Sequence, residues 1–220
     1  MATQMKAPPS TKKEIVDVPF NYRHLVEKYS PGGRYIDAQS DDDSPWVPFG
    51  PTAAIKHLSF DVRRNLFSNI LWVKGPGTIG THFHRGTITM VVLEGSVRYL
   101  EYDWVATPGG LILEVPGESH TLVTEHPNGV KLFGWMEGPI EFYDENAVLV
   151  ETADVWWMMN HYESYCREQN IPINPKLYLE WPAPARSTSS TSAAARRWSP
   201  APPAASASPM PSAWPRRGQK

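Results

Sequence analysis

GTHFHRGTITMVVLEG (residues 80–95) and GGLILEVPGESH (residues 109–120) are the two segments that decide the fold of this chain. Residues two apart in an extended strand point to the same face, so His82 and His84 present both imidazoles to one side. A third imidazole, His120, follows a Pro-Gly turn that could bring a later strand back beside the first. Neutral imidazole is the commonest ligand for iron, copper, nickel and zinc. The pattern predicts a metal site on a β-sheet, and the simpler alternative is three hydrogen-bonded structural histidines.

These segments resemble the two sequence motifs of the cupin family, which are small double-stranded β-helix barrels. The first family motif reads Gly, His-x-His, three or four residues, Glu, six residues and Gly, and the second reads Gly, Pro-x-Gly-x-x-His and then Asn. The matching residues here are His82, His84 and Gly95 for the first motif, and Gly109, Gly117 and His120 for the second.

Three positions depart from the family pattern. The place of the family's glutamate ligand is taken by Ile88, which cannot bind a metal. The proline of the second motif is displaced by one residue, to Pro116, and the asparagine position is Thr124. The resemblance therefore implies a metal held by His82, His84 and His120 without that carboxylate.

The rest of the chain fits an all-β cupin jelly-roll barrel with a short C-terminal helix. Short β-type segments separated by Gly- and Pro-containing turns are expected at residues 56–61, 65–73, 87–93, 96–102, 110–115, 121–124, 131–136 and 140–142. A helix is expected over residues 155–167, where Trp156, Met159, Tyr162 and Cys166 are spaced by three and four. We divide the chain into an N-terminal arm (1–45), a barrel (46–150), a helix with its extension (151–180) and a disordered Ala/Ser/Pro/Arg tail (181–220).

Composition excludes several classes of protein. Six of the 21 basic residues and none of the 23 acidic residues follow Glu180, so residues 1–180 carry 15 basic against 23 acidic residues and a net charge of −8. This balance argues against nucleic acid as a partner of the folded part. No apolar run has the length of a membrane span and residues 1–20 lack a signal-peptide pattern, so no membrane partner is expected. The single cysteine, Cys166, agrees with a reducing, cytoplasmic location.

The sequences flanking the motifs are similar to a narrower family, 2,4'-dihydroxyacetophenone dioxygenase and its relatives. The similarity covers residues 46–178 and includes WVPFG (46–50), GSVRYLEYDW (95–104) and NIPINPKLY (170–178). It implies a cupin with non-haem Fe(II) on three histidines, in which zinc or nickel could substitute. It also implies O2-dependent cleavage of a carbon–carbon bond in an aryl hydroxyketone, giving an aromatic acid and formate, as in the catabolism of aromatic compounds.

The charge of an iron site with three histidine ligands agrees with cleavage of a chelating ketone. Three neutral imidazoles leave Fe(II) with its full charge of +2, which favours a bidentate anionic substrate and leaves room for O2. A base must take the substrate proton, and Glu114 is the first candidate because strand parity places it on the face of His120; the alternative is a solvated or salt-bridged glutamate. The aromatic residues available to line a pocket are Trp72, Phe83, Tyr99, Trp104 and Trp135.

Other functions remain open at this point. They are another three-histidine cupin oxygenase acting on a β-diketone or a thiol, a zinc-loaded cupin sensor of the anti-sigma type, a metal-dependent isomerase, and a plain binding cupin. The remaining histidines, His24, His57, His126 and His161, lie outside both motifs and are expected not to be ligands. Like many cupins, the protein is expected to form a homodimer or homotetramer.

Overall fold

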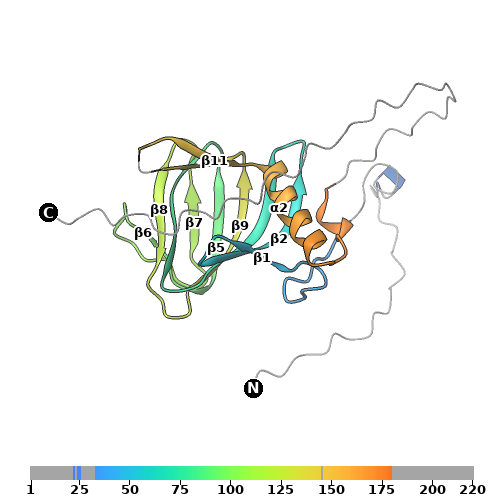
Figure 1. Ribbon diagram of the computed structural model, residues 1–220, viewed down its shortest axis with the longest axis horizontal. Helices are drawn as coiled ribbons and strands as arrows, with labels where there is room; N and C mark the ends of the chain where they lie inside the picture. The colour runs from blue at the N-terminus through green and yellow to red at the C-terminus, as the bar shows by residue number, and fades with distance from the viewer. Residues whose placement is uncertain (1–21, 23, 26–32, 145, 180–220) are drawn as a thin grey trace, which may run out of the picture.

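The computed structural model describes residues 22, 24–25, 33–144 and 146–179, and most of them form two antiparallel β-sheets with one long helix beside them (Figure 1). Residues 1–21, 23 and 26–32 of the expected N-terminal arm lie outside the described residues, as does the tail, 181–220. The architecture is an all-β cupin-like jelly roll, as the sequence predicted.

The described strands, in chain order, are β1 (Trp46–Phe49), β2 (Ala53–Asp61), β3 (Leu66–Val73), β4 (Gly77–His84), β5 (Ile88–Gly95), β6 (Arg98–Tyr99), β7 (Leu111–Glu114), β8 (Ser119–Thr124), β9 (Val130–Glu137), β10 (Ile140–Tyr143) and β11 (Leu149–Ala153). One sheet has the order β1-β2-β3-β9-β5-β7, and the other has the order β11-β10-β4-β8-β6. The three motif histidines lie on β4 and β8 of the second sheet, and Glu114 on β7 of the first sheet faces them.

Each predicted strand is present, although the one expected over residues 96–102 shortens to β6. Strands β1 and β11, which both lie at sheet edges, were not predicted. In β1 the exposed Pro48 stands between the buried Val47 and Phe49, and β11 is exposed along all but its last residue, Ala153. A proline within a run argues against a strand except at an edge, and β11 lacks the apolar alternation by which a half-buried strand is recognised.

The core fills the space between the two sheets. On β5, the buried residues Ile88, Met90 and Val92 alternate with Thr89 and Val91, as the period of two in a strand requires. Residues of the same kind on the other strands join them in one apolar cluster. The sequence pattern of alternating residues therefore sets which side chains reach the interior, and the metal-site histidines belong to that inward set.

Helix α2 (Val155–Glu168) packs at the end of the barrel formed by β1 and β2 (Figure 1). Asp154 caps it by accepting a hydrogen bond from the backbone N–H of Trp157 at 2.9 Å. The buried face of α2 includes Met158 and Tyr162. The expected inward face was therefore right at Tyr162 and wrong at Trp156, which is 60% exposed. In the helix, Met158 takes the inward position because it lies four residues before Tyr162.

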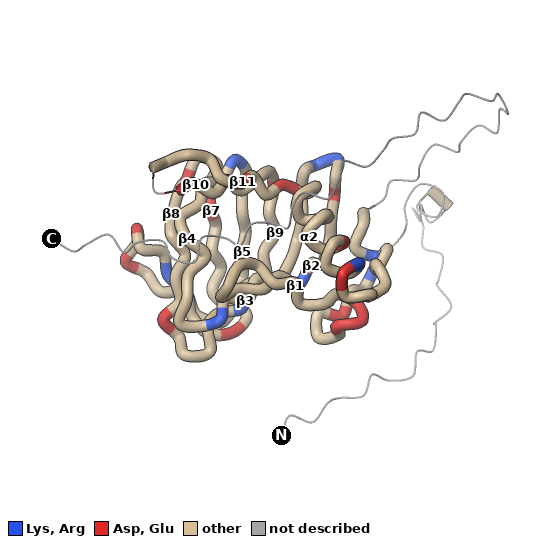
Figure 2. Tube along the Cα trace, viewed as in Figure 1, with Lys and Arg blue, Asp and Glu red and all other residues tan. Residues whose placement is uncertain are grey.

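Charged residues lie mainly in the loops and at the ends of the barrel, while the strands between them carry few (Figure 2). No described helix has both the length and the apolar character that crossing a membrane requires. The interior of the barrel is therefore the place to look for unusual polar groups, and it contains one cluster of them.

Candidate metal centre

Strands β4 and β8 bring the three motif histidines together. They pair antiparallel with His82 directly opposite His120, and His84 ends β4 two residues further on. A turn at Gly117, which has a φ of +95°, closes the end of the β4–β8 pair at His84. Its N–H donates to the carbonyl of His84 at 2.9 Å, and the N–H of His84 donates to the carbonyl of Glu118 at 3.1 Å. The second motif thus holds His84 beside His120 through the backbone.

The three imidazoles converge on one point inside the barrel. One ring nitrogen of each lies within 4.8 Å of those of the other two, and all three side chains are buried. The Nε2 atoms of His84 and His120 are 3.2 Å apart. Within the part of the chain that the structure describes, no other group of three His, Cys, Asp or Glu side chains has this geometry.

Neighbouring groups orient two of the rings. Nδ1 of His82 hydrogen-bonds the carbonyl of Gly80 at 3.2 Å, so Nδ1 carries the hydrogen and Nε2 keeps a lone pair. The ring of Tyr99 stacks on that of His120 with centroids 4.0 Å apart and planes 3° from parallel. Such contacts fix which nitrogen of a ligand histidine faces the metal.

Burial keeps His82 and His120 in the neutral form that binds metals. It lowers the pKa of His82 to about 3, helped by the charges of His84 and His120, and it also lowers the pKa of His120, against the charge of Glu114. A neutral imidazole has a free lone pair, so these side chains need lose no proton to take up a metal at neutral pH. The donor set fits a divalent transition metal of the kind that prefers nitrogen ligands.

Glu114 joins the cluster from the opposite sheet. It is 2% exposed, and its Oε2 atom lies 3.0 Å from Nε2 of His84 while its Oε1 atom lies 3.5 Å from Nε2 of His120. The hydroxyl of Tyr99 donates a hydrogen bond to Oε1, and Oε2 has no well-aligned donor among the described residues. The sequence prediction placed Glu114 on the face of His120 by parity along one strand, but the two residues lie on separate strands, β7 and β8, of different sheets, and they meet because the sheets pack face to face.

The Glu114 side chain is a carboxylate at neutral pH. Burial acts to raise the pKa of this carboxyl, but the proximity and charge of His84, the charge of His120 and the Tyr99 hydroxyl outweigh burial and hold the pKa below its usual value. The site therefore contains one negative charge before any metal is considered.

Ile88 lies beside the cluster without contributing a donor. It is 3% exposed and is paired in register with Glu114, because β5 and β7 run antiparallel and adjacent. The residue that replaces the family's glutamate and the glutamate that reaches the histidines are thus neighbours across one strand pair.

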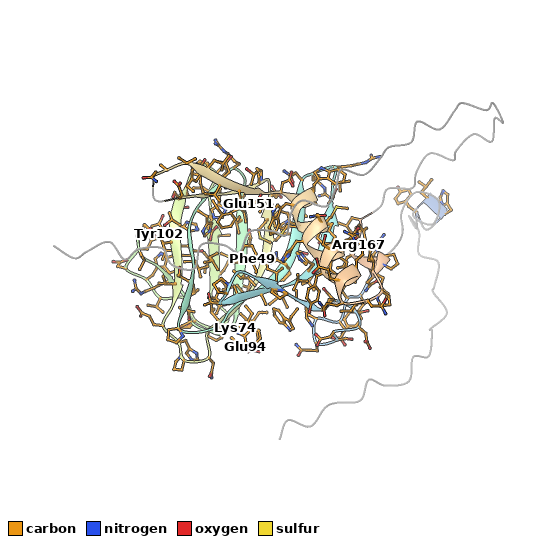
Figure 3. All side chains as sticks on the ribbon, in the orientation of Figure 1. Phe49, Lys74, Glu94, Tyr102, Glu151 and Arg167 are labelled. Carbon is orange, nitrogen blue, oxygen red and sulfur yellow. The ribbon has the colours of Figure 1, made fainter. Side chains whose placement is uncertain are left out.

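An apolar cavity of about 50 Å3 adjoins His82, His84 and Glu114. Its walls include Phe49 of β1, Phe142 of β10 and Met158 of α2, and the ring of Phe142 lies 5.7 Å from that of His82. None of these three was in the predicted aromatic set, because distant segments bring them to the site. Figure 3 shows Phe49 in the middle of the molecule, between the labelled residues Tyr102 and Arg167.

Most of the predicted aromatic set points elsewhere. Trp72 packs edge-on against Trp46, Phe83 lies under the guanidinium of Arg85, and Trp135 is 38% exposed. The two exceptions, Tyr99 and Trp104, meet with centroids 5.0 Å apart.

A second, larger pocket lies on the far side of Glu114. It is open, has a volume of about 560 Å3, and is lined by Tyr99, Tyr102, Trp104, Glu114 and Glu118. The rings of Tyr102 and Trp104 stack with centroids 5.6 Å apart. Glu114 lines both this pocket and the interior cavity, so it lies between solvent and the histidines.

The comparison with known proteins agrees with the cupin assignment. The family model described as the ChrR cupin-like domain matches residues 37–137. An RmlC-like cupin protein from Ralstonia eutropha JMP134 is similar in structure, with a TM-score of 0.63 and 25% identity over 71% of this chain and 99% of that one. An acetylacetone dioxygenase from Acinetobacter johnsonii has a TM-score of 0.54 and 14% identity, with coverages of 60% and 93%. No curated protein matches the sequence.

Proposed function

We propose that this cupin is an Fe(II)-dependent oxygenase that cleaves a carbon–carbon bond in a small chelating ketone. The observation that carries the proposal is the convergence of three buried imidazoles with one carboxylate 3.0 Å from the nearest of them. His82, His84 and His120 would hold the ion, which would supply a template for a bidentate substrate and the electrons for O2. The fold shared with an acetylacetone dioxygenase supports this class of reaction.

In this proposal Glu114 is the base. Its Oε2 atom faces the cluster and accepts the proton that the substrate must lose to become a chelating anion. The Tyr99 hydroxyl holds Oε1, so only Oε2 is free to take that proton. The apolar walls of the interior cavity keep water away from the proton transfer.

The two pockets bear on the size of the substrate. A cavity of about 150 Å3 is known to accept a benzene ring, whereas the interior cavity here measures about 50 Å3. An aryl hydroxyketone would therefore place its chelating end at the histidines and its ring in the 560 Å3 pocket, beside Tyr102 and Trp104. A compact β-diketone would need less of that pocket. Both remain in the proposal, with the aryl hydroxyketone first because of the sequence resemblance.

The test is oxygen uptake by protein reconstituted anaerobically with Fe(II) and offered 2,4'-dihydroxyacetophenone, acetylacetone and a small thiol in parallel. We expect uptake with one of the two ketones, matched by stoichiometric cleavage products. A Trp104→Ala variant should raise KM for the aryl ketone and leave KM for acetylacetone unchanged. If fully iron-loaded protein consumes no oxygen with any of these compounds, the oxygenase proposal for these substrate classes is wrong.

A zinc-holding cupin sensor is the second candidate, because the matching family model describes the ChrR cupin-like domain. In that case the same three histidines would bind zinc for structure alone, and Glu114 would have no proton to accept. Stable zinc binding, a large rise in melting temperature with zinc and no oxygen uptake with iron would together favour the sensor.

A further inference from the structure

We propose that Asn69 selects the substrate: its carboxamide binds a hydroxyl group at the inner end of the ligand, so the site takes a hydroxyketone in preference to a methyl-terminated β-diketone. This inference rests on the proposed function and narrows the substrate class that was left open there. Asn69 is 3% exposed and lies on β3, in the sheet opposite the histidines. It is outside both sequence motifs.

Asn69 is a polar residue in an apolar row. Side chains two apart on a strand share a face, and Phe67, Leu71 and Val73 fill the other inward positions of β3 with apolar groups. Directly opposite Asn69, β9 carries Gly134, and both residues line the interior cavity. Because glycine has no side chain, nothing from that position on β9 covers the carboxamide.

The carboxamide of Asn69 has no hydrogen-bond partner among the described residues. Most buried polar side chains have such a partner, because burying an amide without one is costly. Asn69 lines the same cavity as His82, His84 and Glu114, and every other side chain in the wall of this cavity is apolar. The carboxamide is therefore the one polar group of the described wall outside the histidine cluster, and a ligand in the cavity can pair with it.

The open pocket sets which end of a ligand reaches Asn69. In the proposed function the ring of the substrate lies beside Tyr102 and Trp104, and Glu114 separates their pocket from the interior cavity. The end of the ligand remote from the ring then faces the cavity of about 50 Å3 that Asn69 lines. This inner end is a hydroxymethyl group in an aryl hydroxyketone and a methyl group in a β-diketone such as acetylacetone.

The two inner ends differ in what they offer an amide. A carboxamide has two N–H donors and one carbonyl acceptor, so it can pair with a hydroxyl, or donate to the oxygen that remains after the hydroxyl proton has passed to Glu114. Asn69 keeps its own hydrogens in either case. A methyl group pairs with neither donor nor acceptor and would leave the carboxamide buried and unsatisfied. Sites that hydrogen-bond a substrate hydroxyl reject analogues without it for this reason.

The structural alternative is that Asn69 holds β3 against β2. Its partner there would be His57, which is directly opposite and whose Nδ1 atom also lacks a partner among the described residues. The two roles predict different effects of removing the carboxamide. Loss of a structural hydrogen bond lowers the melting temperature, whereas a polar group retained for a ligand costs stability. Replacement of such a group by leucine, which has a similar shape, should not lower the melting temperature.

The test measures ligand binding by calorimetry, and the melting temperature, for the full chain loaded with Zn(II). Zinc has no redox chemistry, so neither ligand is consumed. The ligands are 2,4'-dihydroxyacetophenone and 1-(4-hydroxyphenyl)butane-1,3-dione, which share the ring and end in a hydroxymethyl and a methyl group. The variants are Asn69→Leu and, as the matched control, Ser68→Ala. Ser68 is the next residue of β3, is equally buried, and has a partner, the hydroxyl of Ser59 at 2.6 Å.

We expect the wild type to bind the hydroxyketone more tightly, and Asn69→Leu to shift the ratio of the two Kd values towards the diketone by about 10–100-fold. Asn69→Leu should melt at or above the wild-type temperature. Ser68→Ala should melt lower and keep the wild-type ratio. An unchanged ratio in Asn69→Leu would overturn the assignment, and so would a wild type that prefers the diketone. Hydroxyketone binding that depends on Asn69, without oxygen uptake by the iron-loaded protein, would support this inference and overturn only the oxygenase.

Discussion

Replacing His161 with alanine should destabilise the protein strongly, although His161 lies outside the metal centre. His161 connects α2 to the barrel: its Nε2 bonds the carbonyl of Pro48 at 2.8 Å, and its Nδ1 lies 3.1 Å from Nε2 of His57. A carbonyl only accepts, so Nε2 of His161 carries the hydrogen and Nδ1 accepts from His57. The alanine variant leaves the N–H of His57, which is fully buried, without an acceptor.

The magnitude follows from the lost contacts. An unsatisfied buried donor costs about 1–3 kcal/mol, and the stacking of His161 on Trp157, at a centroid distance of 5.0 Å, is worth about 0.5–1.5 kcal/mol. We expect a loss of about 2–4 kcal/mol, which lowers the urea midpoint by roughly 1–2 M at the usual slope for a domain of this size. Asn160→Ala, an exposed change on the same helix, is the control and should shift stability by less than about 0.5 kcal/mol.

A double-mutant cycle separates the buried hydrogen bond from general packing. Replacing His57 with phenylalanine in the His161→Ala background removes the unpaired N–H of His57. The free energy of unfolding of the double variant should therefore exceed the value expected from adding the two single-variant effects by about 0.5–3 kcal/mol. Additive effects, or a single-variant cost below about 0.5 kcal/mol, would refute the reasoning.

Three further predictions concern pH, the metal and assembly. Burial, with the charge of His161, holds the pKa of His57 well below its usual value, and burial lowers the pKa of His161. Both histidines therefore take up protons more readily in the unfolded chain than in the folded one. The free energy of unfolding should fall as pH drops below about 6.5, by up to about 1.4 kcal/mol per pH unit for each histidine. Urea titrations of the wild type and the double variant at several pH values would check this, since the double variant should lose that part of the slope. His84→Ala should weaken Co(II) or iron binding by more than about 100-fold while circular dichroism still reports a folded barrel, and stoichiometric iron in that variant would remove His84 from the ligand set. Leu113 is 66% exposed on the edge strand β7, and we expect a second subunit to cover it in the homo-oligomer. Leu113→Lys should therefore lower the molecular mass measured by light scattering. A wild-type chain that is already monomeric would contradict the expectation.

The sequence was most informative where function depends on short-range geometry. Spacing by two put His82 and His84 on one face, and the Pro-Gly turn accounted for the return of His120, because both features depend on only a few neighbouring residues. Glu114 does reach His120, but the two residues lie on β7 and β8 of different sheets, so the meeting comes from the packing of the sheets and not from parity along one strand. The histidine positions follow from local backbone rules that hold whatever the rest of the fold does.

The sequence was least informative where distant segments meet. Phe49, Phe142 and Met158 line the cavity from three elements, and only their packing in three dimensions brings them together. The pairing of Ile88 with Glu114 was equally inaccessible, because the connection between β5 and β7 sets that register. A motif comparison therefore records a missing glutamate at Ile88 and cannot record that its neighbour across the sheet has one.

Moving the carboxylate from one strand to the next changes what else it touches. At Ile88 a glutamate would lie between β7 and Met136 of β9, whereas Glu114 has Tyr99 of the other sheet as its hydrogen-bond partner and forms part of the wall of the open pocket. A substrate that enters through this pocket meets Glu114 before it meets the histidines. For the oxygenase proposed above, this position suits substrates that give up an acidic proton on arrival, the property that chelating hydroxyketones and β-diketones share. The same carboxylate on β5 would line the histidine site without lying on that path, so the strand that carries it contributes to the selection of substrate.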